Sequence, residues 1–333
     1  ALVRIDRPDL SLLKGADYPG MILMALFLGC LEYTLEEGAR WNWFEDDTIR
    51  TTAWIAALAG IAFLWRSLTC AQPIVDLRAL KIRNFSLGCL FSFVTGLGIF
   101  SVIYLTPLFL ARVRGFSALE IGLAVFSTGL FQIATVPIYA FLARRVDLRW
   151  LLGGGFVLFT LSMVAFLPIT HDWGWRELLW PQALRGFSQQ FLVAPTVTLS
   201  LGGLPPERLK LASGLFNLMR NLGGAIGIAA CATILNDRTN LHFLRLAEHL
   251  TTANEAATGL IAQMAATEGG RLSGDPVRAH AAALKILWSL ALREAETMTY
   301  ADAFFAVMAC FALSTLLVPF LHRAGFQPPV TAH

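Results

Sequence analysis

The chain has 333 residues, of which 56% are hydrophobic and only 15% charged, and its mean hydropathy is +0.60. Soluble domains average about 25% charged residues, so this chain has too few polar residues to cover a water-facing surface. The small net charge of +3 gives no indication of a nucleic-acid partner. We therefore predict an all-α fold, a polytopic helical protein embedded in a lipid bilayer.

Eight segments have the length and composition of membrane spans, which need about 20 mostly apolar residues. They are residues 18–35, 51–68, 84–111, 121–143 and 150–170, two more that flank the turn 204–210 within the stretch 180–235, and finally residues 303–321. The chain starts at Ala1 with no signal-peptide pattern. We expect residues 1–16 to be a basic linker, either because an N-terminus was removed or because the chain is the second part of something longer.

The bias of lysine and arginine in short loops predicts the orientation. If the N-terminus is inside, the inner segments hold twelve basic residues, namely Arg4, Arg7, Lys14, Arg78, Lys81, Arg83, Arg144, Arg145, Arg149, Arg208, Lys210 and Arg323. The outer short loops hold five, namely Arg40, Arg50, Arg112, Arg114 and Arg176. We predict that both ends are cytoplasmic and that the long loop 236–300 is external.

The loop 236–300 is patterned rather than featureless. Leucine and alanine repeat at helical spacing in residues 241–250 and again in 277–291, and Gly269-Gly270 and residues 273–276 separate the two runs. Asp275 is placed to cap the second helix. Two interpretations remain open: a helical hairpin lying on the membrane surface, or a docking surface for a periplasmic partner.

The stretch 180–235 carries the polar residues most indicative of a solute pathway. Arg185 and Arg220 each interrupt an apolar run, and an arginine at mid-helix costs roughly 2.5–3.5 kcal/mol on insertion scales. Gln189 and Gln190 lie close to the face of Arg185, and Pro195 is expected to bend that helix. On the next span Asn217, Arg220, Asn221 and Gly224 share one face, which lines either a cavity or a neighbouring helix.

Side chains on earlier spans are further candidates for the same cavity: Phe100, Tyr104, Gln132 and Tyr139. Carboxylates are scarce in the spans. Asp17, Glu32 and Asp302 lie near span ends, as interfacial charges would, so a coupling carboxylate is expected elsewhere. The glycine triplet 153–155 lies in an apolar segment and indicates close helix packing.

No catalytic or metal-binding pattern is present in the sequence. It lacks H-E-x-x-H, a P-loop and G-x-S-x-G. The five cysteines form no C-x-x-C pair and the histidines show no ligand spacing. We predict that the protein is not an enzyme and has no cofactor and no metal site.

Several motifs together resemble the major facilitator superfamily, within it the EmrB/QacA-type drug/proton antiporters with 14 spans. They are D-Y-P-G-M-I-L-M-A-L-F-L-G-C-L-E-Y-T-L-E-E-G with W-N-W-F in residues 17–44, Q-P-I-V-D-L at 72–77, L-A-R-R-V-D-L-R-W at 142–150, W-P-Q at 180–182, and A-S-G-L-x-N-x-x-R-x-x-G-G-A-I-G at 212–227. The resemblance covers nearly the whole chain.

The resemblance implies the following organisation. Residues 1–16 are a cytoplasmic linker, 17–70 the inserted helix pair of this subfamily, and 71–84 a cytoplasmic loop. Residues 85–321 are the C-terminal six-helix bundle with the periplasmic helical loop 236–300, and 322–333 are a cytoplasmic tail. The six spans that precede the inserted pair in a full member are missing here, and with them the acidic residue linked to proton coupling.

The resemblance further implies a multi-pass transporter of the bacterial inner membrane that exports hydrophobic or amphipathic small molecules in exchange for protons. Its partners would be an EmrA-like periplasmic adaptor and an outer-membrane channel. We interpret the chain as the C-terminal part of such a multidrug exporter, inactive without its six N-terminal spans. The alternatives are a non-transporting membrane scaffold and a degenerate remnant.

Overall fold

Our computed structural model describes residues 17–70, 74–250, 255–271 and 276–322. In these residues all regular structure is helical, which confirms the predicted all-α class. Short 3₁₀ turns accompany the long helices, which are α2 (Tyr18–Gly38), α3 (Asp47–Thr69), α4 (Arg83–Arg112), α5 (Ala118–Leu142), α6 (Leu148–Phe166), α7 (Trp175–Leu201), α8 (Pro206–Glu248), α9 (Glu255–Arg271) and α10 (Pro276–Thr315).

Local capping sets where several helices begin. Asp46 precedes α3, and its side-chain oxygen accepts hydrogen bonds from the backbone N–H groups of Thr48 (2.8 Å) and Ile49 (3.1 Å). Ser117 and Glu120 form a capping box at the start of α5. These caps satisfy N–H groups that a helix start leaves without partners, so each helix restarts promptly after a short turn.

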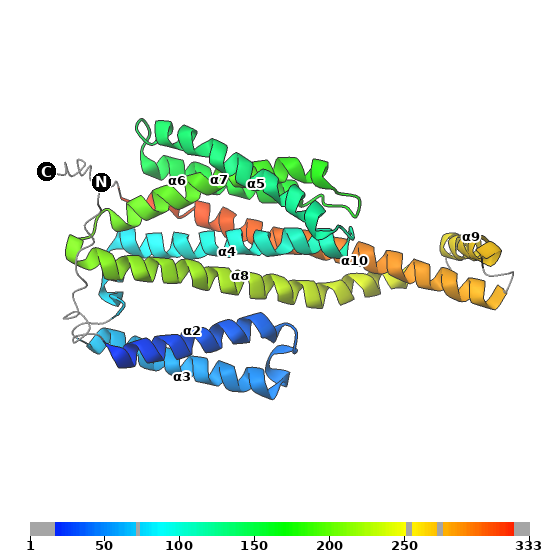
Figure 1. Ribbon diagram of the computed structural model, residues 1–333, viewed down its shortest axis with the longest axis horizontal. Helices are drawn as coiled ribbons and strands as arrows, with labels where there is room; N and C mark the ends of the chain where they lie inside the picture. Colours follow the sequence, from blue (N-terminus) through cyan, green and yellow to red (C-terminus); the bar gives the residue numbers. More distant parts are fainter. Residues whose placement is uncertain (1–16, 71–73, 251–254, 272–275, 323–333) are drawn as a thin grey trace, which may run out of the picture.

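Helices α4 to α8 and α10 form one bundle (Figure 1). Within it α4 contacts α7, α8 and α10, while α6 contacts α7 and α10 and α5 lies against α7. Phenylalanines fill the centre: the rings of Phe159 and Phe311 stack at 4.0 Å between centroids, and those of Phe166 and Phe304 at 4.5 Å. Each such ring adds a large buried apolar area to the packing between helices.

The glycine triplet in α6 is only partly explained by packing. A Cβ atom on Gly155 would lie 2.8 Å from the carbonyl oxygen of Phe191 on α7, so close helix packing is confirmed at this position. A Cβ on Gly154 would meet no atom within 4 Å.

Helices α2 and α3 form a hairpin beside the bundle, next to α8 (Figure 1). Apolar side chains join the hairpin to α4 and α8 near one end: Phe63 of α3 belongs to the same buried cluster as Phe85, Leu215 and Phe216, and Phe27 of α2 packs against it. Most of the hairpin surface remains exposed and apolar, as expected for helices surrounded by lipid.

Seven of the described helices are long and apolar enough to cross a membrane: α2, α3, α4, α5, α6, α8 and α10. These correspond to seven of the eight predicted spans. The remaining prediction falls on α7, which has the length of a span at 27 residues but a more polar composition. Helix α7 is continuous through Pro181 and Pro195.

The loop 236–300 differs from its expected form. Helix α8 continues without a break to Glu248, and α10 begins at Pro276, so both spans extend well beyond their apolar runs. The two helices project together from the bundle, and α9 packs against α10 at the far end (Figure 1). Gly269-Gly270 lies inside α9 rather than in a break, and the predicted cap Asp275 lies outside the described residues.

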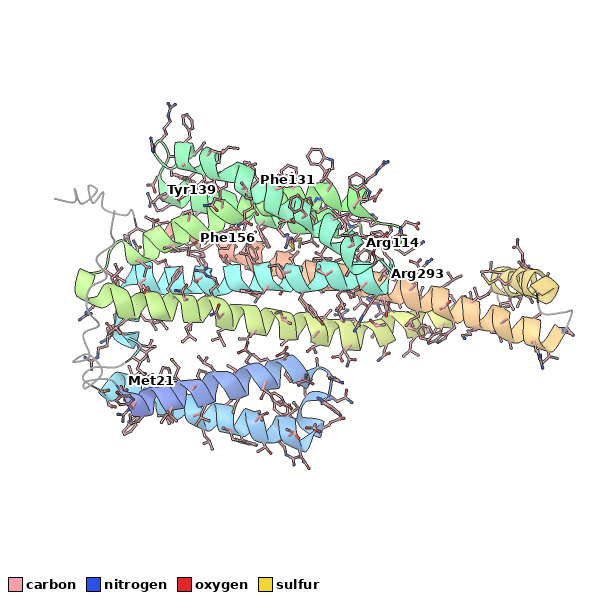
Figure 2. All side chains as sticks on the ribbon, viewed as in Figure 1. Met21, Arg114, Phe131, Tyr139, Phe156 and Arg293 are labelled. Atoms are coloured by element: carbon pink, nitrogen blue, oxygen red, sulfur yellow. The ribbon has the colours of Figure 1, made fainter. Side chains whose placement is uncertain are left out.

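We call this projecting part, residues 236–248, 255–271 and 276–300, the extension. Charged residues gather where it leaves the bundle, the region of Arg114 and Arg293 in Figure 2. The guanidinium of Arg114 donates to the carbonyl oxygen of His171 at 3.1 Å and pairs with Asp172 at 3.7 Å. The His171 ring in turn contacts the Glu294 carboxylate of α10. The base of the extension is therefore tied to the loop between α6 and α7.

Candidate functional site

Arg185 is buried between α5 and α7, with 4% of its surface exposed. Its Nη2 donates hydrogen bonds to the hydroxyl oxygen of Thr128 on α5 (2.8 Å) and to Oε1 of Gln182 (3.0 Å). Thr128 also bonds to that same Gln182 oxygen. The amide nitrogen of Gln182 donates to the carbonyl of Ala124 at 3.0 Å. The predicted pathway residue thus lies in a polar network that joins two helices.

A close backbone contact sets the register of this network. A Cβ atom on Gly186 would lie 2.3 Å from the carbonyl oxygen of Thr128, so only glycine permits α5 and α7 to approach this closely. Gly186 directly follows Arg185, and the contact therefore brings Thr128 within reach of the guanidinium. The hydrogen-bond partners of the Arg185 guanidinium are a neutral hydroxyl and a neutral amide. No carboxylate of the described residues forms an ion pair with Arg185.

Arg220 occupies a different place, on α8. Its Nη2 donates to Oδ1 of Asn217 at 3.2 Å, and its guanidinium lies 5.5 Å from the ring centroid of Phe216. The side chain is half-buried beside a small cavity of about 10 Å³ that also touches Ser92 and Thr95 of α4 and residues of α7. The two arginines singled out by the sequence therefore do not share one site.

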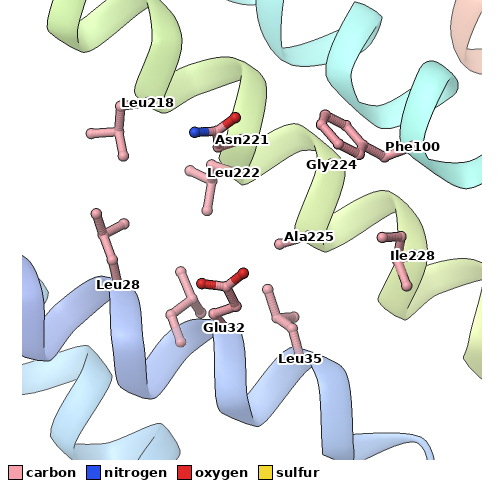
Figure 3. A pocket seen from close by; sticks show the side chains of 11 residues that line it. Leu28, Glu32, Leu35, Phe100, Leu218, Asn221, Leu222, Gly224, Ala225 and Ile228 are labelled. Atoms are coloured by element: carbon pink, nitrogen blue, oxygen red, sulfur yellow. The ribbon is translucent and has the colours of Figure 1, made fainter.

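Asn221 and Gly224 line a different space, a cleft of about 360 Å³ between α8 and α2 (Figure 3). The ring of Phe100 packs over Gly224, where a Cβ atom would lie 2.5 Å from it. Across the cleft α2 presents the carboxylate of Glu32. The rest of the lining is apolar: Leu28, Leu31, Leu35, Leu218, Leu222, Ala225 and Ile228.

The remaining candidates are spread over the bundle. Tyr104 is half-buried against the main core, and Tyr139 packs edge-on against Phe191 of α7 with 5.7 Å between ring centroids. Gln132 of α5 lies near Gly186, and Gln189 and Gln190 are half-buried on α7 beside the buried Pro195. The structure therefore divides the predicted pathway among the network of Arg185, the environment of Arg220 and the cleft at Asn221.

Sequence analysis did not select Gln182 or Thr128 as site residues. Gln182 is fully buried and lies one turn before Arg185, so its spacing was a signal that it shares a helix face with the arginine. Glu32 was interpreted as an interfacial charge, and the structure instead places its carboxylate in the cleft facing α8. The sequence of α2 does not reveal this, because it does not determine which face of the helix packs beside α8.

Buried charge is scarce in the described part of the chain. The buried acidic and basic side chains there are Asp17, Asp76, Arg185 and His242. Both aspartates cap helix starts, Asp17 through Gly20 at 3.1 Å and Asp76 through Arg78 at 3.0 Å. Within the described ranges no three potential ligand residues cluster in a way that suits a metal ion.

Comparison with known proteins assigns most of the chain to one protein family. The family model described as Major Facilitator Superfamily matches residues 88–332. The colistin resistance protein EmrB of Acinetobacter baumannii is 33% identical over 264 residues, which cover 79% of this chain and 51% of that protein. The multidrug export protein EmrB of Escherichia coli K12 is 32% identical over 255 residues, covering 75% and 49% respectively.

A third relative, the fatty acid resistance protein FarB of Neisseria gonorrhoeae, is 28% identical over 251 residues, covering 74% of this chain and 50% of that protein. The chain therefore spans about half the length of the curated relatives it matches.

Proposed function

Since the chain belongs to the major facilitator superfamily, and within it to the EmrB type of multidrug transporter, we propose that it is the C-terminal part of a proton-coupled exporter of hydrophobic or amphipathic compounds. Its bundle supplies one wall of the transport pathway, and six further spans supply the other. Arg185, Arg220 and the amide side chains near them contact solute or the facing half. The transporter is a bacterial inner-membrane protein with both ends of this chain in the cytoplasm.

The distribution of buried charge is the observation that carries this proposal. Coupling to a proton gradient requires a carboxylate that binds and releases a proton at membrane depth. In the described residues, the buried carboxylates Asp17 and Asp76 both cap helix starts instead, and Glu32 lines the cleft between α2 and α8 rather than the centre of the bundle. We infer that the coupling carboxylate belongs to spans outside this chain, which agrees with its covering about half of its relatives.

Reconstitution tests the proposal directly. The full-length protein in proteoliposomes is expected to move ethidium against its gradient when a proton gradient is imposed, and to stop when a protonophore is added. The 333-residue chain reconstituted alone is expected to give no proton-dependent movement. Transport by this chain alone would refute the proposed division between two halves.

The size of the native polypeptide separates this proposal from its alternatives. An antibody against the C-terminal residues F-Q-P-P-V-T-A-H is expected to detect a band in membranes well above the 36.5 kDa of this chain. A band at 36.5 kDa would instead favour a membrane scaffold, or a degenerate remnant that has lost transport.

The extension favours a partner on its side of the membrane. Two long helices carry α9 away from the bundle, which exposes it to a second protein (Figure 1). We propose that the extension is periplasmic and docks an EmrA-like adaptor, which in turn joins an outer-membrane channel. Deletion of residues 255–271 is expected to abolish copurification of the adaptor while the transporter still reaches the membrane. Unchanged recovery of the adaptor would refute docking at α9.

A further inference from the structure

The cleft between α2 and α8 contains one charged group in an otherwise apolar lining. Glu32 projects from α2 toward Asn221, Gly224 and Ala225 of α8 (Figure 3). In the described residues no hydrogen bond or ion pair satisfies the Glu32 carboxylate. Arg220 lies one residue before Asn221, but it bonds to Asn217 and borders the separate small cavity next to α4.

The position of Glu32 along α2 places it inside a helix long and apolar enough to span a membrane. Helices α2 and α8 begin at the same end of the molecule (Figure 1). With a rise of about 1.5 Å per residue, Glu32 lies about 21 Å along α2 from Tyr18, and Asn221 lies about 22 Å along α8 from Pro206. A hydrocarbon core about 30 Å thick that begins with these two helices contains both side chains. A carboxylate without a partner is unfavourable at this depth, and a cation beside it removes that cost.

The size and lining of the cleft specify the ligand. A volume of about 360 Å³ is that of a small-molecule site, for which about 300–1,000 Å³ is typical. Leucine and isoleucine side chains and the ring of Phe100 contact an apolar body, while Glu32 is the only charged residue of the lining. The Asn221 amide orients a polar group. An anion would be repelled, and a purely apolar ligand would leave the carboxylate unpaired.

We propose that this cleft binds a lipophilic organic cation, with the positive charge against Glu32 and the apolar body between α2 and α8. The hairpin thereby forms one wall of a binding site and is more than a connector between two bundles. Met21, Ile22 and Leu26 of α2 are exposed, so the hairpin also carries apolar surface for the surrounding lipid. The inference depends on the proposed export function only for its biological meaning, because binding requires no gradient.

Equilibrium binding of tetraphenylphosphonium to the native full-length protein in dodecyl maltoside tests the site, measured by titration calorimetry. Tetraphenylborate, the anion of the same shape, serves as the charge control. Wild-type protein is expected to bind the cation and not the anion. Glu32→Gln is expected to weaken binding of the cation at least about tenfold, which corresponds to about 1.4 kcal/mol.

Glu36→Gln is the matched control, because Glu36 lies one turn further along α2, is exposed and does not line the cleft. It is expected to bind the cation as wild type does. Ala225→Leu keeps every charge and fills the cleft, so it also is expected to weaken binding, and it tests the site if Glu32→Gln fails to fold. Equal affinities of Glu32→Gln and Glu36→Gln, or full binding by Ala225→Leu, would overturn the proposal.

The source of the cation is settled by adding phosphatidylethanolamine to the micelles. Displacement of tetraphenylphosphonium would identify the lipid ammonium group as the natural occupant, and no displacement would favour a free organic cation; either result supports a cation site. Export is measured separately in proteoliposomes. If the wild-type protein exports ethidium but does not bind tetraphenylphosphonium, the cation site in the cleft is refuted and the transport proposal is not. If it binds tetraphenylphosphonium but exports nothing, the transport proposal is refuted and the cation site is not.

Discussion

Nη2 of Arg185 on α7 lies 2.8 Å from the hydroxyl oxygen of Thr128 on α5, and this hydrogen bond links the two helices inside the bundle. The guanidinium keeps its charge away from lipid by pairing with neutral groups, the Thr128 hydroxyl and the Gln182 amide. Its Nε has no partner among the described groups. The charge is thus fixed in position but not neutralised by the described part of the chain.

Replacing Arg185 by alanine is expected to lower the free energy of unfolding by about 1–3 kcal/mol, since buried polar partners lose a charged hydrogen-bond donor. Thermal unfolding of the full-length protein in dodecyl maltoside measures the change. Arg220→Ala is the control: Arg220 is half-buried and bonds to an exposed Asn217, so a change within about 0.5 kcal/mol is expected. Equal losses in both variants would contradict the structural distinction between the two arginines.

Transport gives a second comparison of the same variants. Both Arg185→Ala and Arg220→Ala are expected to reduce ethidium export more than they reduce the amount of protein in the membrane, because both positions belong to the proposed pathway. Export divided by the membrane level, determined by immunoblot, is the quantity to compare with wild type. Parallel falls in export and membrane level would show that the arginines serve insertion and folding only.

The sequence was sufficient to place Arg185 inside an apolar run, and hence to predict that it avoids lipid. It did not identify Thr128 as a partner, because that contact depends on the register of α5 against α7. Gly186 sets this register through backbone contact with Thr128, a relation between segments more than fifty residues apart. The position of Glu32 in the cleft was not predicted for the same reason, because tertiary packing decides which face of α2 lies toward α8.

Hydropathy also did not predict that two helices continue beyond their spans. It reports where a chain leaves the membrane, whereas a helix ends where its backbone meets a stop signal. Residues 236–248 contain no glycine or proline, so α8 continues past its apolar run, and residues 277–300 likewise contain neither. The helical periodicity within 236–300 was recognised correctly, but its continuity with the spans was not.

The close contact of α4 with α8 leads to a prediction about glycine. A Cβ atom on Gly223 would lie 2.0 Å from the carbonyl oxygen of Phe93, and backbone atoms cannot rotate away as a flexible side chain can. Gly223→Ala is therefore expected to force the helices apart and to destabilise the protein by about 1–3 kcal/mol. Gly214→Ala, in the same helix, meets no atom within 4 Å and is expected to be neutral or to stabilise by up to about 1 kcal/mol. Similar melting temperatures for the two variants would contradict this packing.

The stability of the hairpin is expected to depend on pH through Asp17, which precedes α2. Burial alone would raise the pKa of Asp17, but the Arg66 guanidinium at 2.6 Å and the Gly20 N–H outweigh it and hold that pKa below its usual 3.8. The folded protein thus favours the carboxylate. Its contribution to stability is complete above pH 3.8 and is lost as the pH falls through the lowered pKa of the folded state.

Melting temperatures of wild type and Asp17→Asn, measured from pH 7 down to pH 3, test this dependence. Asp17→Asn lacks the charge at every pH, so the difference between the two proteins is expected to be largest near neutrality and to shrink toward pH 3. Asp47→Asn is the control, because the Asp47 side chain is 85% exposed and its pairing with Arg50 contributes little. A difference between wild type and Asp17→Asn that is constant with pH would contradict the assignment.

A contact between α8 and α10 joins the two helices where the extension leaves the bundle. Nε2 of His242 lies 2.8 Å from the carboxylate of Asp302, and Arg238 approaches the same oxygen at 3.6 Å. His242 is buried and the Asp302 side chain is 36% exposed, so solvent weakens this contact less than it weakens a fully exposed pair. In a double-mutant cycle His242→Ala and Asp302→Ala are expected to show a coupling energy of about 0.5–3 kcal/mol in thermal unfolding.

The exposed pair of Arg50 with Asp47 provides the comparison cycle, for which about 0.2–1 kcal/mol is expected. If α8 and α10 are joined through His242 and Asp302, either single substitution also makes the extension more accessible to protease, and the second substitution adds little. Additive losses of stability in the His242 and Asp302 cycle would show that the two side chains act independently, and the extension would then depend on its apolar contacts alone.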